Sequence, residues 1–176
     1  MALRTDPEPI EKLLTLITDF TCDWLAHQKA CFPSIEGVFI LDDIVGFLGE
    51  ADFQATALPY LKRAFGCIDV PVRFFHNDAQ GLVCAGFLRE MGVNLFNFSF
   101  EHSLAEMRKR AGDTVTLLGN IPPRDVLAQG TPEEVAASVQ AALEPLSDKS
   151  RLILSCGGGM PPEVPTANIE ALLAAV

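Results

Sequence analysis

Polar side chains follow five apolar stretches of this chain, each at the point where the stretch ends. They are Asp42 and Asp43, His76 to Asp78, Glu101 and His102, Gly119 and Asn120, and Cys156 to Gly159. Carboxylates, an imidazole and a thiol are the groups that carry general acid–base chemistry or hold a metal ion. The sequence therefore predicts one polar site, to which several segments contribute their ends.

The triplet His76, Asn77 and Asp78 carries the richest chemistry. Alternation along a strand puts His76 and Asp78 on the same side, where both could ligate one metal ion. A third ligand must then come from another strand end, and Cys156 is the thiol candidate, because thiolate and imidazole both suit zinc. The alternative is that the histidine and the aspartate hydrogen-bond to substrate or backbone.

Asp42 and Asp43 are neighbours at a strand end, so their side chains point to opposite sides. One of them can face a pocket while the other caps or binds a neighbouring loop. Paired acids in such a place suit metal binding, acid–base work or a cationic group. The alternative is that both only cap a helix and hydrogen-bond a loop.

Three glycines, Gly157, Gly158 and Gly159, follow an apolar stretch. They allow the backbone to approach a ligand closely and supply amides that can bind an anion. The segment lacks the Walker lysine and the spacing of a dinucleotide fingerprint. The alternative is a tight turn without a ligand.

The elements that must position these residues alternate between strand and helix. The predicted strands cover 37–43, 71–78, 93–100, 114–120 and 151–159. Strands joined by crossover helices pair in parallel, and parallel sheets place their chemistry at the carboxyl ends of the strands. The pattern predicts an α/β fold, a partial (β/α)8 TIM barrel with about five strands instead of eight.

Capping residues and apolar periodicity predict the helices between these strands. They run from about 10 to 28, from 52 to 65 with a break or kink at Pro59, from Gln80 to Met91 with an end at Gly92, over 104–110 and 124–128, from a Thr131 cap to about Leu146, and over 166–175. No linker divides the chain, which predicts a single domain over 1–176.

Composition narrows the classes of function. The 176 residues are 49% hydrophobic and 20% charged, with a net charge of -10, which is typical of a globular protein and argues against a nucleic-acid partner. No apolar run has membrane-spanning length and no signal peptide is recognised, so a cytoplasmic protein without membrane contact is expected. The five dispersed cysteines predict reduced thiols.

Several segments together resemble the uroporphyrinogen decarboxylase superfamily, which includes cobalamin-dependent methyltransferases. The segments are Leu118 to Asn120, Gly130 to Val135 and the end from Gly157, supported by 41–50 and 57–63. The resemblance covers nearly the whole chain and is to the carboxyl-terminal half of the family's barrel. It implies that the amino-terminal barrel strands are absent here.

Two departures from the family's motifs bear on the site. The decarboxylases have a glycine-histidine-glycine motif where this chain has Gly157 to Gly159, so Gly158 replaces the histidine. In the methyltransferases a His-x-Cys motif and a later cysteine hold zinc. His76 matches that histidine, Asp78 replaces the first cysteine, and the later cysteine falls nearest Gly158, two positions from Cys156.

The resemblance implies methyl transfer between a methylcorrinoid, carried by a partner protein, and a small acceptor, with zinc as a cofactor. In this interpretation Asp43, His76 and Asp78 line the pocket and Asp42 supports them. Asn120 hydrogen-bonds the ligand, while Asn77 and the three glycines bind substrate.

Two alternatives stay open. One is decarboxylation of a tetrapyrrole, without a cofactor, in which acidic side chains position the pyrrole nitrogens. The other is a truncated, non-catalytic subunit that binds a partner through its sheet edge. Unpaired edges at 38–41 and 152–155 predict self-association, or a second polypeptide that supplies the missing strands, and little activity of the isolated chain.

Overall fold

The structure, a computed structural model, describes residues 2–79 and 81–176, which contain a five-stranded parallel sheet. The strands lie side by side in chain order. They are β1 (Gly37–Leu41), β2 (Val72–Asn77), β3 (Leu95–Phe98), β4 (Thr116–Ile121) and β5 (Leu152–Cys156). Every neighbouring pair is parallel, which confirms the predicted α/β architecture of a partial TIM barrel.

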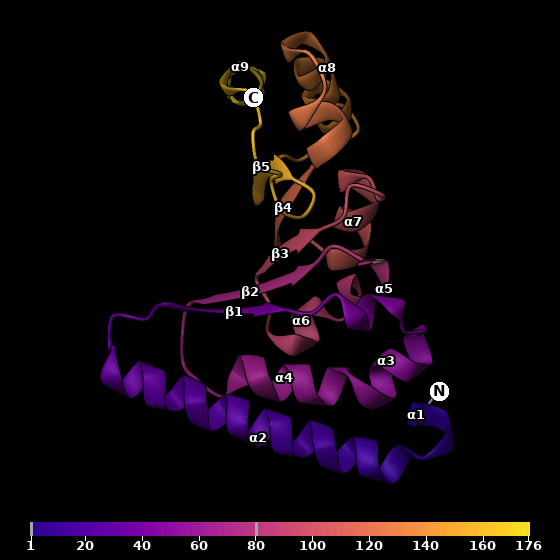
Figure 1. The fold of residues 1–176 in the computed structure, drawn as a ribbon, viewed down its shortest axis with the longest axis vertical. Helices are drawn as coiled ribbons and strands as arrows, with labels where there is room; N and C mark the ends of the chain where they lie inside the picture. Colours follow the sequence, from indigo (N-terminus) through magenta and orange to yellow (C-terminus); the bar gives the residue numbers. More distant parts are fainter. Residues whose placement is uncertain (1, 80) are drawn as a thin grey trace.

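Helices or helical turns separate the strands, as the alternation predicts. They are α1 (Ala2–Thr5), α2 (Pro7–Cys31), the 3-10 turn η1 (Ile44–Phe47), α3 (Glu50–Thr56), α4 (Leu58–Gly66), α5 (Leu82–Ala85), α6 (Leu88–Met91), α7 (Leu104–Ala111), the π-helical turn η2 (Pro123–Ala128), α8 (Pro132–Leu143) and α9 (Thr166–Ala174). Figure 1 shows how they follow the strands along the chain.

Local signals account for most helix boundaries. The break predicted near Pro59 is present, because α3 ends at Thr56 and Pro59 lies in the first turn of α4, where its missing amide is tolerated. The capping box of α8 also forms: Thr131 Oγ1 accepts from the Glu134 amide, and Glu134 Oε2 accepts from the Thr131 amide. This helix ends at Leu143, three residues before the predicted end.

The helix predicted from Gln80 to Met91 needs a correction. The structure divides the described part of this segment into α5 and α6, and Gln80 lies outside the described residues. Gly86 separates the two short helices, and glycine is a weak helix former. The predicted end at Gly92 is confirmed, since Gly92 adopts φ 78° as a left-handed cap.

Helices cover one face of the sheet and leave the other bare. In Figure 1 the helices from α4 to α8 follow one side of the curved sheet. Strand side chains that point to them are buried, as with Val38, Phe75 and Phe96. On the opposite side, the apolar side chains of the two edge strands are exposed, Phe39 to 57% and Ile153 to 49%. The core therefore lies between the sheet and the helices that cover this face.

The longest helix, α2, forms an outer layer against α4 (Figure 1). An ion pair between Arg63 and Asp19 joins the two helices. Much of the apolar surface of α2 remains in solvent, including Leu16 and Phe20. No helix among the described residues combines the length and the apolar character that crossing a membrane requires.

Candidate functional site

The register of β1 and β2 determines which polar side chains meet. Leu41 pairs with His76, so Asp43 and Asp78, each two residues further along, lie next to each other beyond the strand ends. The backbone amide of Asp78 donates to Asp43 Oδ1 at 3.1 Å, which fixes this approach. Two neighbouring strands thus deliver two carboxylates and one imidazole to the carboxyl edge of the sheet.

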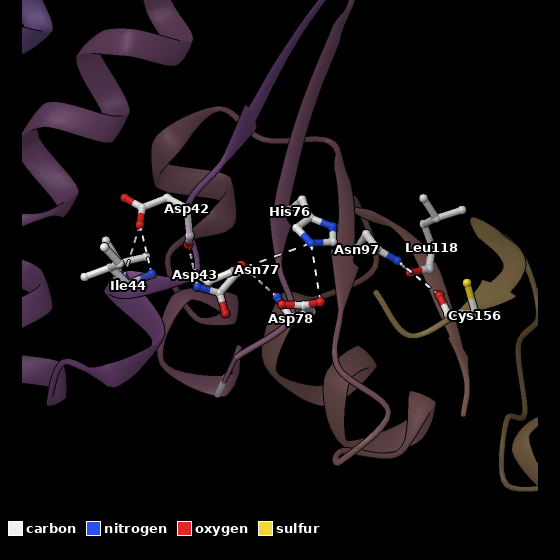
Figure 2. Close-up of polar contacts among 10 residues, drawn as sticks. Asp42, Asp43, Ile44, His76, Asn77, Asp78, Asn97, Leu118 and Cys156 are labelled. Carbon is white, nitrogen blue, oxygen red and sulfur yellow. Dashed lines mark hydrogen bonds and ion pairs between the residues drawn. The ribbon is translucent and has the colours of Figure 1, made fainter. Parts of the chain in front are cut away.

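Asp43, His76 and Asp78 form a compact cluster, shown in Figure 2. His76 Nε2 lies 3.7 Å from Asp78 Oδ2 and 4.0 Å from Asp43 Oδ1. One ligand atom from each residue lies within 4.8 Å of the other two. The placement of His76 and Asp78 on one side agrees with strand alternation. We refer to these three residues as the carboxylate–histidine cluster.

Asp42 lies on the other side of the strand end, as its alternation with Asp43 requires. Its Oδ1 accepts from the backbone amides of Ile44 at 3.0 Å and Val45 at 3.4 Å, so the side chain caps η1. Burial raises the pKa of this carboxyl, and the two amide hydrogen bonds oppose that effect. Asp42 therefore does not join the carboxylate–histidine cluster through its side chain.

Asn77 lies between His76 and Asp78 at the end of β2, but its side chain points to the other face of the sheet. It was expected to bind substrate, but its side chain is fully buried on the helix-covered face. Asn77 Nδ2 donates to the backbone oxygen of Asp42 at 2.7 Å and ties the end of β2 to that of β1. Since a buried amide cannot reach a ligand on the open face, Asn77 positions the strands that carry the cluster.

Cys156 lies outside the carboxylate–histidine cluster. Alternation along β5 turns its side chain away from the open face, and the thiol packs with Leu127 and Val135. Its Sγ donates to the Gly158 backbone oxygen at 3.3 Å, and burial raises its pKa. The structure thus leaves Cys156 out of the predicted ligand set, and Asp43 stands beside His76 and Asp78 instead.

The glycine segment after β5 approaches the cluster closely. A Cβ atom at Gly157 would lie 2.6 Å from the Phe100 amide nitrogen, and one at Gly158 would lie 2.5 Å from Asp78 Oδ2. Gly158 has a φ of 85°. Gly159 has open space around it. The missing side chain at position 158 would therefore point at Asp78.

Asn120 lies at the end of β4, after a cis peptide bond from Gly119. Its Nδ2 donates to the backbone oxygens of His102 and Ser99 and so holds the turn between β3 and α7. This amide is committed to the protein itself. The predicted hydrogen bond from Asn120 to a ligand stays a prediction, which only its carboxamide oxygen can fulfil.

Sequence reasoning missed Asn97, a nearly fully buried residue of β3 that pairs with His76. Asn97 Nδ2 donates to the backbone oxygens of Leu118 at 2.7 Å and Cys156 at 3.4 Å, which joins β3 to β4 and β5 (Figure 2). The sequence signal that could have found it is a polar residue between two phenylalanines, Phe96 and Phe98, in an otherwise apolar strand. Asn97 keeps the carboxyl ends of these strands together.

The pKa of Asp78 is raised above its usual 3.8, first by burial and then by the negative charge of Asp43, while His76 opposes the shift. The folded chain therefore binds this proton more tightly than the unfolded chain. Below pH 3.8 both states are protonated and the shift has no effect on stability. As the pH rises from 3.8 through the raised pKa, the folded state loses stability, and the loss is complete above that pKa.

Replacing Asp78 by asparagine should remove this pH-dependent loss. We expect the free energy of unfolding of Asp78→Asn, relative to that of the parent chain, to increase as the pH is raised from 3 to 7. Urea unfolding with chelator present measures both free energies. Asp113→Asn, at an exposed loop position, is the control and should change equally at both pH values. A constant difference between Asp78→Asn and the parent at both pH values would contradict the prediction.

Gly158→Ala should destabilise the chain by about 1–3 kcal/mol, since an L-residue is strained at this φ and its Cβ displaces the Asp78 carboxylate. Gly159→Ala is the matched control, because its Cβ meets nothing within 4 Å, and it should change stability by less than about 0.5 kcal/mol. Thermal or urea unfolding of both variants measures the difference. Equal effects of the two substitutions would count against the close approach.

The fold and the site define a protein of the (β/α)-barrel class: parallel strands lie in chain order with helices between them, and a polar cluster lies at their carboxyl ends. The described residues contain five of these strands. The family described as "Uroporphyrinogen decarboxylase (URO-D)" matches residues 1–176. The chain belongs to this family.

Relatives by sequence carry the name uroporphyrinogen decarboxylase. One from Chloroherpeton thalassium is 28% identical over 175 residues, covering 95% of this chain and 48% of the relative. Another from Dichelobacter nodosus is 27% identical over 174 residues, covering 98% and 49%. A solved structure, a methyltransferase from Methanosarcina mazei, matches with a TM-score of 0.82 and 18% identity over 99% of this chain and 50% of its own. The chain thus spans about half the length of these proteins.

Proposed function

We propose that the carboxylate–histidine cluster binds a divalent metal ion such as zinc and serves methyl transfer from a methylcorrinoid to a small acceptor. The observation that carries the proposal is the convergence of one imidazole and two carboxylates within 4.8 Å at the ends of β1 and β2. These residue types fit a metal ion, and two oxygens beside one nitrogen favour a harder site than a thiolate set. A metal ion held there would lower the pKa of a bound acceptor.

The positions matched by resemblance to the methyltransferases support this reading. Their histidine corresponds to His76, their first cysteine to Asp78 and their later cysteine to the neighbourhood of Gly158. In this chain His76 lies 3.7 Å from Asp78, and a side chain at Gly158 would point at the same carboxylate. The closeness of these three positions supports one site, in which Asp78 would supply an oxygen at the place of the first cysteine and Asp43 a second oxygen from the neighbouring strand.

The chain's own residues would orient and prepare the acceptor. Asp43 and Asp78 would place negative charge where a cationic centre or an acidic proton binds. The raised pKa of Asp78 makes its carboxylate a stronger proton acceptor than an ordinary aspartate. Gly157 and Gly158 let the backbone after β5 pass close to Phe100 and Asp78, where a Cβ would clash. The corrinoid would arrive on a partner protein at the carboxyl edge of the sheet, where the cluster lies.

Decarboxylation of a tetrapyrrole is the second candidate, supported by the names of the curated relatives. In that reaction Asp43 and Asp78 would position pyrrole nitrogens, and no metal ion would be needed. Gly158, which stands where decarboxylases have a histidine, is the departure that weighs against it.

The experiment that separates the two candidates follows both reactions with one preparation. Methylcobalamin and a small thiol test methyl transfer by the absorbance change on demethylation, with zinc or with chelator, and a porphyrinogen tests decarboxylation. Each assay is run with and without a polypeptide that corresponds to the other half of a relative. Zinc-dependent demethylation that is lost in His76→Ala supports the proposal, whereas decarboxylation insensitive to chelator would replace it with the second candidate.

A further inference from the structure

A separate cavity of about 460 Å³ lies between α2, β1 and α4, on the side of the sheet away from the carboxylate–histidine cluster. Its wall is largely aliphatic, with Leu14, Ile40 and Leu61 among its residues. Ile17 and Ile44 also line it and are 51% and 76% exposed, so the cavity reaches the surface. Its volume lies within the range of about 300–1,000 Å³ that is typical of small-molecule sites.

Four residues that line this cavity carry a hydroxyl group, and each hydroxyl donates its hydrogen to a backbone carbonyl. Thr18 donates to Leu14 at 2.7 Å, Thr21 to Ile17 at 2.8 Å, Thr56 to Asp52 at 2.6 Å and Tyr60 to Glu11 at 3.3 Å. A hydroxyl that has given its hydrogen away has only lone pairs left to offer. These four hydroxyls therefore have no hydrogen left to donate to a ligand and can only accept.

Asp42 is the remaining polar side chain of the lining, and it is also an acceptor. Its Oδ1 is occupied by the amides of Ile44 and Val45, whereas Oδ2 has no hydrogen-bond partner among the described residues. The lining contains no lysine, arginine or histidine to balance the carboxylate. An apolar cavity in which every polar side chain accepts is complementary to a ligand that donates and carries positive charge.

We propose that this cavity binds a small amphipathic amine, with its ammonium group on Asp42 Oδ2 and its apolar body against the aliphatic wall. An alcohol with the same body can also donate to Asp42, but without the charge. A carboxylate ligand would face Asp42 with like charge. The order of affinity that follows is amine, then alcohol, then carboxylate.

Titration calorimetry on the 176-residue chain at pH 7 tests this order with n-octylamine, 1-octanol and octanoate. We expect octylamine to bind about tenfold more tightly than octanol, because charge-assisted hydrogen bonds are roughly twice as strong as neutral ones. Octanoate should bind more weakly than octanol. Equal binding of all three probes, or no binding of octylamine, would overturn the proposal.

Two substitutions test whether octylamine binds in this cavity. Asp42→Asn keeps an oxygen that can accept from the Ile44 and Val45 amides, so it preserves the cap of η1 while it removes the preference for amine over alcohol. Asp69→Asn, at an exposed position, is the charge-matched control and should keep that preference. Ala64→Leu fills the cavity and should weaken octylamine and octanol alike by about tenfold. Unchanged amine preference in Asp42→Asn would show that the amine binds elsewhere and would overturn the assignment.

Discussion

His76→Ala is expected to weaken zinc binding by at least about 100-fold. Even partners outside the metal's ligand shell affect metal affinity by about 10–100-fold, so loss of the only nitrogen ligand of the carboxylate–histidine cluster should cost no less. Competition with a chromophoric chelator measures the affinity. Because metal binding displaces protons, and Asp78 holds its proton to higher pH than usual, affinity in the parent chain should rise as the pH is raised from 4 to 7.

Matched variants distinguish the cluster from other ligands. His27→Ala removes an exposed histidine on α2 and should leave zinc affinity unchanged. Cys156→Ser should also leave it unchanged, because the thiol packs with Leu127 and Val135 instead of facing His76. Asp43→Asn should weaken binding, since Asp43 belongs to the proposed ligand set with His76 and Asp78. If zinc affinity depends on Cys156 and not on Asp43, the ligands are His76, Asp78 and Cys156, as predicted from the sequence.

The second large effect concerns the bare face of the sheet. We expect the 176-residue chain to self-associate, so that light scattering gives a mass above that of a single chain at micromolar concentration. Phe39, stacked on Phe74 with ring centroids 4.6 Å apart, and Ile153 are exposed apolar residues on opposite edge strands. Apolar side chains beside unpaired strand edges favour association.

Phe39→Lys together with Ile153→Lys should reduce the mass to that of one chain. Phe20→Lys is the matched control, because this phenylalanine is 68% exposed and belongs to α2 instead of to the sheet. It should leave the association unchanged. A monomeric parent chain, or dissociation caused by Phe20→Lys alone, would show that the sheet is not the contact surface.

The same surface is where a polypeptide supplying further strands would bind. If such a partner is the physiological one, adding the half of a relative that this chain does not span should convert the self-associated chain into a one-to-one complex. The methyl-transfer and decarboxylation assays then apply to that complex. Self-association and partner binding should compete, because both cover Phe39 and Ile153.

The sequence alone determined the class of fold, because strand and helix signals are local. Apolar stretches that end in polar residues predicted five strands, and Thr131, Pro59 and Gly92 marked helix boundaries that the structure confirms. The two-residue period of a strand also placed His76 and Asp78 together and separated Asp42 from Asp43. These inferences need only backbone geometry within one segment.

Tertiary structure decided which segments meet. The pairing of Leu41 with His76 brings Asp43 to Asp78, and no spacing within either strand contains that register. The burial of Asn77 and the packing of Cys156 against Leu127 depend on which face the helices cover. The cavity beside Asp42 likewise exists only because α2 lies against α4 and β1. Strand register, the choice of the buried face and side-chain packing all depend on pairs of segments that are distant in the sequence. The sequence therefore supplied the residue types of the candidate site, and the tertiary structure determined which of them lie together.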